Sequence, residues 1–513
     1  MLVKTFGSAV HGVDAYTITI EVDVGTGQPR YYMVGLPDNA VKEAWQRIET
    51  ALKINGYRMP RQKIVINMAP ADIKKEGSAY DLPMAIGILA SSGQLLGDEL
   101  SKYIIMGELS LDGQLQPIKG ALPIAIQARK DKFKGFILPK QNAREAAIVN
   151  DIDVYGVENI KEVIDFLNGD INLEPIFVDT RHEFFSNQNN LEIDFSDVKG
   201  QENIKRALEI AAAGGHNVIL IGPPGAGKTM LAKRLPTILP PLSLYEALDT
   251  TKIHSVAGKL PSESSLVYLR PFRSPHHTVS DVALVGGGNN PQPGEISLAH
   301  NGVLFLDELP EFKRTVLEVL RQPMEDRKVT ISRARFSVEY PASFMLLASM
   351  NPCPCGYYNH PEKECVCAPG VVQKYLNKIS GPLLDRIDLH VEVTPVPFRE
   401  LSAVRTTERS EEIRKRVIDA RNIQEERFKN FTEVYCNAQM SSKTLREVCV
   451  INSAGQTLLN RAMEKLGLSA RAYDRILKVA RTIADLASSE DIQVEHLAEA
   501  IQYRSLDRDN WAG

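Results

Sequence analysis

The chain has 513 residues, of which 43% are hydrophobic and 24% charged, and a formal net charge of −4 at pH 7. This length suffices for about three domains, and the composition is typical of a globular protein. The slight negative charge predicts no overall attraction to nucleic acid, so DNA binding would need a local basic patch. No apolar run approaches the ~18 residues of a membrane span, and residues 1–8 lack the apolar core of a signal peptide. We therefore expect a cytoplasmic protein that does not engage a membrane.

Residues 1–175 mix strand and helix patterns, which predicts a separate α/β domain. Residues 16–24 alternate with period two, as in a half-buried strand. The other expected elements are a strand at 63–68, helices at 39–52, 83–91 and 122–129, and a hairpin at 107–113.

Two segments of this domain, residues 75–81 and 107–122, resemble the proteolytic domain of Lon-type proteases. That domain has a fold like ribosomal protein S5 and uses a Ser–Lys dyad, so the resemblance implies an S5-like fold here. Its serine and lysine positions fall on Ala79 and Ala125, whose side chains cannot act as nucleophile or base. Ser78 is adjacent, but no lysine stands near residue 125 to activate it. We expect an inactive domain kept as a scaffold or as a module that binds DNA or a protein partner.

Residues 176–195 contain the polar cluster 187–190 and are interpreted as a linker to an ATPase core at 196–400. The stretch 194–201 and the helix expected at 202–213 resemble the opening of AAA+ modules. In those modules the segment that corresponds to Val198, Gly200 and Gln201 borders the adenine.

A phosphate-binding loop follows the apolar strand expected at 217–221 and precedes a helix that begins near residue 230. It fits the pattern G-x-x-x-x-G-K-[ST] with the residues Gly222, Pro223, Pro224, Gly225, Ala226, Gly227, Lys228 and Thr229. The glycines let backbone N–H groups face a phosphate, and the helix N-terminus adds positive potential. We expect ATP as the ligand, with Lys228 on the β- and γ-phosphates and Thr229 on Mg²⁺. A chance glycine-rich turn is the alternative, and a second motif argues against it.

That second motif is the apolar run 303–306 followed by two carboxylates. Asp307 fits the residue that holds Mg²⁺ in P-loop NTPases. Glu308 is placed to polarise a water against the γ-phosphate. A third apolar strand at 344–350 ends at Asn351, which matches the sensor-1 asparagine of AAA+ proteins and would contact the γ-phosphate or the attacking water.

About 75 residues separate the two nucleotide motifs, more than a minimal core needs. They include the tandem histidines His276 and His277, which lack a third metal ligand nearby and are interpreted as loop residues. They also include the triple glycine within 285–291, a flexible loop tip that would thread into a pore, touch DNA or simply move.

An amphipathic helix is expected at 309–321, and two strand-like runs follow at 329–341. These runs resemble the pre-sensor hairpin of one AAA+ branch, which faces the central pore. Four cations make this hairpin basic: Arg327, Lys328, Arg333 and Arg335. These cations would either contact DNA or form a solvated face or a subunit interface.

Four cysteines fall within fifteen residues: Cys353, Cys355, Cys365 and Cys367. Two close pairs of thiolates can form a tetrahedral S₄ site, which favours Zn²⁺. His360 is an alternative ligand, and free or redox-active thiols are the alternative to zinc. The remaining cysteines, Cys436 and Cys449, are isolated and expected to be structural.

In AAA+ families with the pattern of residues 380–388, the arginine that corresponds to Arg386 reaches into the neighbouring subunit's active site. Such a guanidinium stabilises charge on the γ-phosphate, which would require an oligomer. The alternative is an ion pair with Asp385 or Asp388 of the same chain.

Residues 401–513 are expected to form a helical lid, with periodic stretches at 411–429, 451–465, 470–487 and 494–503. Arg471 begins the third stretch and fits the sensor-2 arginine that joins lid to nucleotide. Arg461, Arg475 and Arg481 are expected at the surface or an interface.

The tract from residue 270 through 351–356 to 380–386 closely resembles the ComM/YifB family of bacterial magnesium-chelatase-like AAA+ proteins. The resemblance spans nearly the whole chain. It implies a homo-hexameric ATPase that acts on single-stranded and branched DNA, with branch migration during natural transformation as the family's activity and recombination proteins as possible partners. Two alternatives are a magnesium-chelatase subunit and an ATP-driven protein remodeller.

Overall fold

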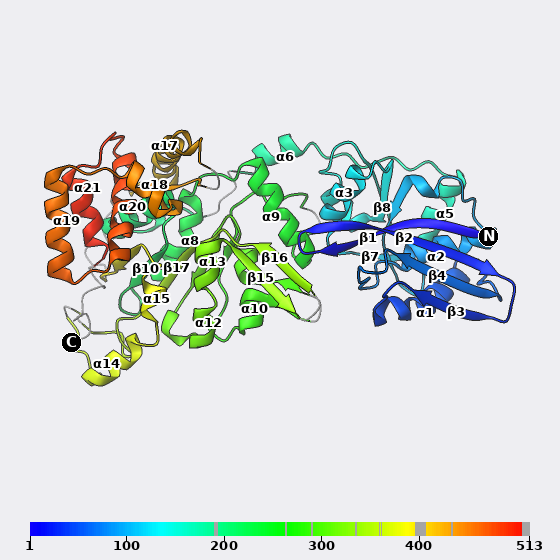
Figure 1. The fold of residues 1–513 in the computed structure, drawn as a ribbon, viewed down its shortest axis with the longest axis horizontal. Helices are drawn as coiled ribbons and strands as arrows, with labels where there is room; N and C mark the ends of the chain where they lie inside the picture. Colours follow the sequence, from blue (N-terminus) through cyan, green and yellow to red (C-terminus); the bar gives the residue numbers. More distant parts are fainter. Residues whose placement is uncertain are drawn as a thin grey trace.

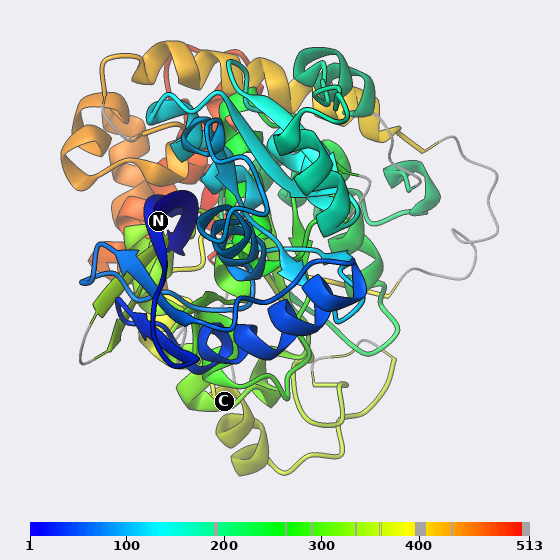
Figure 2. The ribbon, with the colours of Figure 1, turned by 90° about the vertical axis from the view of Figure 1, so that its right-hand side faces the viewer.

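The computed structural model describes residues 1–188, 193–261, 264–288, 291–333, 336–358, 360, 362–395, 407–431 and 434–504. The molecule is elongated, with a sheet-rich N-terminal part and a helical C-terminal part at opposite ends of a central α/β part (Figure 1). Seen along the long axis, the N-terminal part lies in front of the other two (Figure 2). This architecture confirms the expected fold class. None of the described helices is long and apolar enough to cross a bilayer.

The N-terminal part is built on a seven-stranded sheet with the order β3-β4-β2-β1-β5-β8-β9. Its strands are β1 (Leu2–His11), β2 (Asp14–Gly25), β3 (Arg30–Val34), β4 (Lys63–Ala69), β5 (Tyr103–Ile105), β8 (Gly135–Pro139) and β9 (Asp153–Val157). β2 pairs antiparallel with β1 and β4, and the remaining neighbours run parallel. Ile18, Ile20 and Val22 of β2 are fully buried, as their period-two spacing predicts.

Five helices share one hydrophobic core with this sheet. They are α1 (Asn39–Ile54), α2 (Asp81–Ser91), α3 (Ala121–Lys130), α4 (Lys140–Ala146) and α5 (Ile160–Asn168). Every residue of α2 is buried, which its almost unbroken apolar sequence requires. The two-residue strands β6 (Glu108–Leu109) and β7 (Leu115–Gln116) form a small hairpin. All six elements expected here are confirmed within a few residues.

The central part contains a five-stranded parallel sheet with the order β11-β14-β17-β10-β18. Its strands are β10 (Val218–Ile221), β11 (Phe272–Arg273), β14 (Val303–Leu306), β17 (Met345–Met350) and β18 (Leu389–Glu392). β10, β14 and β17 are buried throughout, as expected for apolar strands between helical layers. Because the strands are parallel, the loops that follow β10, β14 and β17 meet at one edge.

Helices and short hairpins surround this sheet. They are α7 (Glu202–Gly214), α8 (Lys228–Ile238), α9 (Leu244–Ala257), α10 (Asp281–Val285), β12 (Gly286–Gly287), β13 (Gln292–Pro293), α11 (Glu295–Leu298), α12 (Arg314–Glu318), α13 (Arg321–Asp326), α14 (Pro369–Leu376) and α15 (Gly381–Leu384). The strands β15 (Lys328–Arg333) and β16 (Phe336–Pro341) pair antiparallel, which confirms the hairpin expected at 329–341. Arg335 and residues 289–290 lie outside the described residues.

The prediction of a single helix over residues 309–321 is wrong. A 3₁₀ turn at Leu309–Glu311 is followed by extended backbone at Phe312 and Lys313 before α12 begins. Pro310 is compatible with a first helical turn, but the extended step at Phe312 and Lys313 ends it and lets Phe312 enter the core, where it is buried.

The C-terminal part is helical, with α17 (Ser410–Phe428), α18 (Ser442–Val448), α19 (Ser453–Leu466), α20 (Ala470–Leu486) and α21 (Val494–Gln502). The four stretches expected to be helical are confirmed. Val417 of α17 and Ile476 of α20 belong to the same hydrophobic core as Leu208 of α7 and Leu231 of α8. The bundle is therefore packed directly on the helices that flank the phosphate-binding loop. Residues 505–513 lie outside the described chain.

The stretch interpreted as a linker contains the helix α6 (Thr180–Asn187), while residues 189–192 are not described. Phe184 of α6 is buried with Ile148 of the N-terminal part and Leu242 of the central part. Glu183 of the same helix accepts hydrogen bonds from Arg144 (2.6 Å) and from the Tyr268 hydroxyl (2.8 Å). This helix thus bridges the two parts.

A second bridge joins α3 and α4 to α9. The carboxylate of Glu145 accepts hydrogen bonds from the Ser255 hydroxyl and from the backbone N–H of Leu122, the latter at 2.9 Å. The backbone N–H of Gly120 donates to the Ser255 carbonyl at 3.1 Å. Burial raises the pKa of Glu145, and the hydrogen bonds from Ser255, Leu122 and Asn142 oppose that rise.

Candidate nucleotide site

The phosphate-binding loop lies between β10 and α8, in the strand–loop–helix context that its motif requires. A Cβ atom at Gly222 would stand 2.3 Å from the carbonyl oxygen of Val393, so no larger residue fits there. Gly225 and Gly227 have positive φ values of 79° and 83°, which favour glycine. The sequence of the loop is therefore fixed by its backbone path as much as by phosphate chemistry.

Lys228 points back along the loop. Its ammonium donates to the carbonyl oxygens of Gly222 (2.7 Å) and Pro223 (3.0 Å) and to Oδ1 of Asn351 (3.0 Å). Burial lowers the pKa of Lys228, while Asp307 and Glu308 oppose this shift. The predicted phosphate lysine and the predicted sensor-1 asparagine are thus in direct contact.

Thr229 and Asp307 are also brought together. The Thr229 hydroxyl donates to Oδ2 of Asp307 at 2.7 Å, and the Ser349 hydroxyl donates to Oδ1. A hydroxyl and a carboxylate at this distance fit the oxygen donors that Mg²⁺ prefers. Ser349 was not predicted from the sequence, although a single hydroxyl inside the apolar strand β17 indicates a polar contact there.

Glu308 follows β14 with a left-handed backbone, φ 53°, which is uncommon for a residue that has a Cβ. Its side chain is 58% exposed, and Oε2 lies 3.7 Å from Nδ1 of His277. The rings of His276 and His277 are 4.1 Å apart, and His276 bonds Thr278 rather than a metal set. The tandem histidines therefore belong to the loop beside the catalytic candidate, as a loop interpretation predicts.

Gln201 joins the segment 198–201 to the phosphate-binding loop. Its Nε2 donates to the carbonyl oxygen of Ala226 at 2.8 Å. Its backbone is left-handed, with φ 59°, at the start of α7. This contact explains why the segment 198–201 lies against the phosphate-binding loop.

Arg386 does not meet the nucleotide residues of its own chain. Its guanidinium pairs with Glu325 of α13 at 2.5 Å and donates to the Pro382 carbonyl at 2.6 Å. The alternative partners Asp385 and Asp388 have other contacts: Asp385 pairs with Arg471 at 3.3 Å, and Asp388 with Arg475 at 3.0 Å.

Asp388 is buried, which by itself would raise its pKa, but Arg475 and His216 hold the pKa well below its usual range. Arg475 is partly exposed and pairs with Asp388 across the contact between lid and core, whereas the expectation that Arg481 lies at the surface or an interface is wrong. Arg481 is buried and pairs with Asp485 at 3.1 Å within the lid. Arg461 is exposed, as expected.

The four clustered cysteines converge. Sγ of Cys353 is 3.3 Å from that of Cys355 and 3.7 Å from that of Cys365, and all four sulfur atoms lie within 4.8 Å of one another. Tetrahedral Zn–S bonds of about 2.3 Å place sulfur atoms at about this separation. His360 is not part of this group.

The cysteine cluster lies against the phosphate-binding loop through Gly356. Gly356 closes a turn on Cys353, with its N–H donating to the Cys353 carbonyl at 3.0 Å. A Cβ at Gly356 would stand 2.5 Å from Cδ of Pro224. Burial alone would raise the pKa of Cys355, but hydrogen bonds from the backbone of Tyr357 and from Cys353 lower it to about 6.

The N-terminal part has no dyad at the positions of the Lon pattern. Ala125 is fully buried in α3, and the Ser78 hydroxyl donates to the carboxylate of Glu108. Neighbouring Asp81 is buried and paired with Arg47 at 2.7 Å. These contacts satisfy the polar groups around Ser78 without a lysine base.

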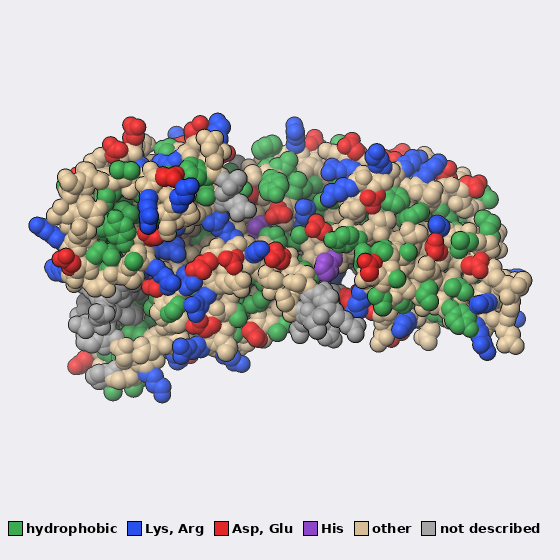
Figure 3. All heavy atoms as spheres, viewed as in Figure 1, with side chains coloured by type: hydrophobic (Ala, Val, Ile, Leu, Met, Phe, Trp, Pro, Cys, Tyr) green, Lys and Arg blue, Asp and Glu red, His purple; other side chains and the backbone are tan. Residues whose placement is uncertain are grey.

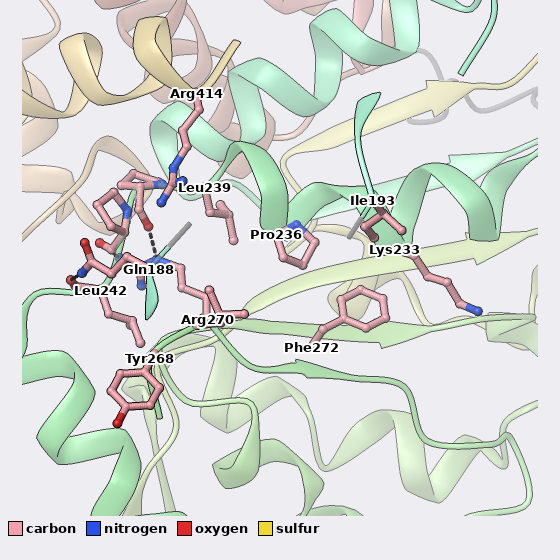
Figure 4. A pocket seen from close by; sticks show the side chains of 13 residues that line it. Gln188, Ile193, Lys233, Pro236, Leu239, Leu242, Tyr268, Arg270, Phe272 and Arg414 are labelled. Carbon is pink, nitrogen blue, oxygen red and sulfur yellow. Dashed lines mark hydrogen bonds between the residues drawn. The ribbon is translucent and has the colours of Figure 1, made fainter. Parts of the chain in front are cut away.

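A cavity of about 350 Å³ lies beside the far end of α8 and is not the nucleotide site. Figure 4 shows Lys233 and Pro236 of α8, Arg270 and Phe272, and Arg414 of α17 around it. Gln188 donates to the Leu242 carbonyl at 3.1 Å across its rim. As far as the described chain shows, no residue of the phosphate-binding loop lines it.

Comparison with known proteins identifies the family. Three family models match: magnesium chelatase subunit ChlI over residues 194–401, subunit ChlI of Mg-chelatase over 20–142, and the ChlI C-terminal region over 407–504. The competence protein ComM of Haemophilus influenzae is 45% identical over 511 residues, which cover 99% of this chain and 98% of that one. The uncharacterized protein YifB of Escherichia coli is 46% identical over 502 residues, 98% of this chain and 96% of that one. Lon protease 2 of Bacillus subtilis is 33% identical over 159 residues, 28% of this chain and 27% of that one. The chain belongs to the ComM/YifB family of magnesium-chelatase-like AAA+ proteins.

Proposed function

We propose that this protein is an ATP-hydrolysing DNA motor that works as a homo-hexamer and drives branch migration in homologous recombination. One observation carries the proposal: Lys228, Thr229, Asp307 and Asn351 converge at the carboxyl edge of a parallel sheet, while Arg386 does not join them. In such a site an arginine from a second copy of the chain can stabilise the charge that develops on the γ-phosphate. The relative named as a competence protein supports a role during natural transformation.

In this proposal ATP lies on the loop from Gly222 to Thr229, with Mg²⁺ held by Thr229 and Asp307. Bound Mg²⁺ neutralises charge on the β- and γ-phosphates. Lys228 would exchange its loop carbonyls for phosphate oxygens, and Glu308 would orient the attacking water.

Three further residues complete the site. Asn351 would bond the γ-phosphate from its position beside Lys228, since the two already touch at 3.0 Å. Arg471 would link the lid to the nucleotide, and Arg386 would act on the neighbouring subunit's γ-phosphate. Arg471 pairs with Asp385, the residue that precedes Arg386 in the chain.

DNA, single-stranded or branched, would be contacted by the β15–β16 hairpin and the glycine loop at β12. Acidic and basic side chains are interspersed over the face of the molecule in Figure 3, so this face has no single-sign field that would attract DNA as a whole. A cytoplasmic location and an association with recombination proteins fit this activity.

We also propose that Cys353, Cys355, Cys365 and Cys367 bind one Zn²⁺ ion. The convergence of four sulfur donors supports it, as does the small size of a loop that has few apolar residues to hold it. Bound zinc would fix the turn at Gly356 against Pro224.

The test is ATP hydrolysis with single-stranded, duplex and four-way-junction DNA at one stated salt concentration, because phosphate contacts depend on salt. Stimulation by branched DNA, together with strand exchange on a mobile junction, supports the motor. Hydrolysis that ignores every DNA but responds to partner chelatase subunits or to peptides would instead identify a chelatase subunit or a remodeller. The family models named after magnesium chelatase are the observation that favours the first of these.

A further inference from the structure

The side chain of Arg386 is enclosed within its own chain. Two of its nitrogen atoms are engaged, one by Oε1 of Glu325 at 2.5 Å and one by the Pro382 carbonyl at 2.6 Å. Only 11% of the side chain is exposed. The nitrogen atom that pairs with Glu325 is free for another acceptor only after it leaves that carboxylate.

We propose that Glu325 is a positioning residue that restrains Arg386 and releases it when the β15–β16 hairpin engages DNA. The inference rests on the proposed role of Arg386 in the neighbouring active site. It adds a regulatory step to that role: the carboxylate competes with the neighbour's γ-phosphate for one guanidinium.

Hydrogen bonds with Asn217 hold the backbone around Arg386. Asn217 Nδ2 donates to the Arg386 carbonyl at 3.1 Å. Two residues further on, buried Asp388 pairs with Arg475 of α20 and accepts the backbone N–H of Asn217 at 3.0 Å. Rotation of the Arg386 side chain would therefore break its contacts with Glu325 and the Pro382 carbonyl but leave these backbone contacts in place.

Glu325 is well placed to sense the hairpin. It lies near the end of α13, three residues before β15 begins. The backbone N–H of Arg327 donates to the Pro323 carbonyl at 2.9 Å, and the Arg327 carbonyl accepts the N–H of Ala342 at 2.8 Å. These bonds tie the base of the hairpin to α13, so a displaced hairpin carries Glu325 with it.

The strength of the pair suits a switch. Glu325 is 55% exposed, so solvent screens its attraction for the guanidinium. A phosphate oxygen forms a stronger, charge-assisted contact with a guanidinium. Glu325 can thus slow the release of Arg386 without preventing its contact with the phosphate.

The experiment uses Glu325→Gln, which keeps the shape of the side chain and removes its charge. Steady-state ATP hydrolysis is measured with and without four-way-junction DNA, and kcat and KM are fitted separately. The matched control is Glu158→Gln, because Glu158 is also 55% exposed and pairs with Lys140 at 2.6 Å, but belongs to the N-terminal part.

We expect kcat without DNA to rise about fivefold in Glu325→Gln, the equivalent of about 1 kcal/mol, with KM for ATP and kcat with DNA unchanged. Glu325→Asp, which restores the charge, should return part of the DNA dependence. A purely structural role would lower kcat in both conditions alike and would not respond to Asp.

The restraint is overturned if Glu325→Gln matches the wild type with and without DNA, or if its kcat falls equally in both. Arg386→Ala separates this failure from that of the proposed function. If Arg386→Ala abolishes hydrolysis while Glu325→Gln has no effect, only the restraint is wrong. If Arg386→Ala hydrolyses ATP normally, the role of Arg386 itself is wrong and the restraint falls with it.

Discussion

The Thr229 hydroxyl donates a 2.7 Å hydrogen bond to Asp307, although 78 positions separate the two residues in the chain. β10 and β14 both pair with β17 in parallel, so the residues that follow these strands reach the same edge of the sheet. The sequence suggests these two motifs only separately, and the fold brings them together into one site.

Replacing Lys228 by Ala removes the ammonium that contacts Asn351 and two loop carbonyls. We expect nucleotide affinity to fall by at least about tenfold, which corresponds to about 1.4 kcal/mol, as measured by titration with a fluorescent ATP analogue. Lys233→Ala, on the same helix but beside the cavity, is the control. Equal affinities for the two variants would contradict the assignment of the site.

Glu308→Gln should separate binding from hydrolysis. The side chain is exposed at the end of β14, where it would orient a water and not hold the nucleotide. We expect kcat to fall by about 10²–10⁴-fold, with ATP affinity within about twofold of the wild type, measured by steady-state kinetics and binding. A variant that loses binding in proportion to kcat would show that Glu308 positions the nucleotide instead.

Removal of metal from the cysteine cluster should loosen the nucleotide loop, because the turn at Gly356 rests on Pro224. We expect one Zn²⁺ per chain by elemental analysis, and a lower Tm and weaker ATP binding after chelation. Cys365→Ser should show both defects without chelator. Cys436→Ser, outside the cluster, should retain the metal. Purified protein that contains no zinc and is indifferent to chelators would leave the thiols free.

The contact between Glu145 and Ser255 should make the junction of the N-terminal and central parts sensitive to pH. Burial raises the pKa of Glu145 above its ordinary value of 4.5. Folding therefore favours the protonated form, and its contribution to stability is complete below pH 4.5 and is lost as pH rises through the folded-state pKa.

Glu145→Gln keeps an uncharged hydrogen-bonding group at this junction. We expect it to stabilise the protein by about 1–2 kcal/mol at pH 8 and by less at pH 5, as measured by thermal unfolding at both pH values. The exposed substitution Glu158→Gln should change neither. A stabilisation that is larger at pH 5 than at pH 8 would reverse the assigned sign.

Local patterns in the sequence determined much of this protein. The period-two alternation of β2, the apolar strands β10, β14 and β17, and the lid helices were all predictable because burial imposes a fixed spacing on apolar residues. The glycines of the phosphate-binding loop were also predictable. Only glycine tolerates the close approach of Val393 at Gly222, and glycine is favoured at the positive φ values of Gly225 and Gly227. The helix expected at 309–321 failed because the burial of Phe312 outweighed helical periodicity.

Only the tertiary structure decided which partners the charged side chains take. Nothing in the sequence distinguishes Glu325 from Asp385 or Asp388 as the partner of Arg386, because ion pairs form between residues that folding brings together from distant segments. The same holds for Arg481. Its charge predicts a surface position, but the side chain is buried because Asp485 and two backbone carbonyls accept its hydrogen bonds. Periodicity and motif spacing are local and survive in the sequence, whereas pairing across the fold depends on the packing of strands and helices and exists only once the chain has folded.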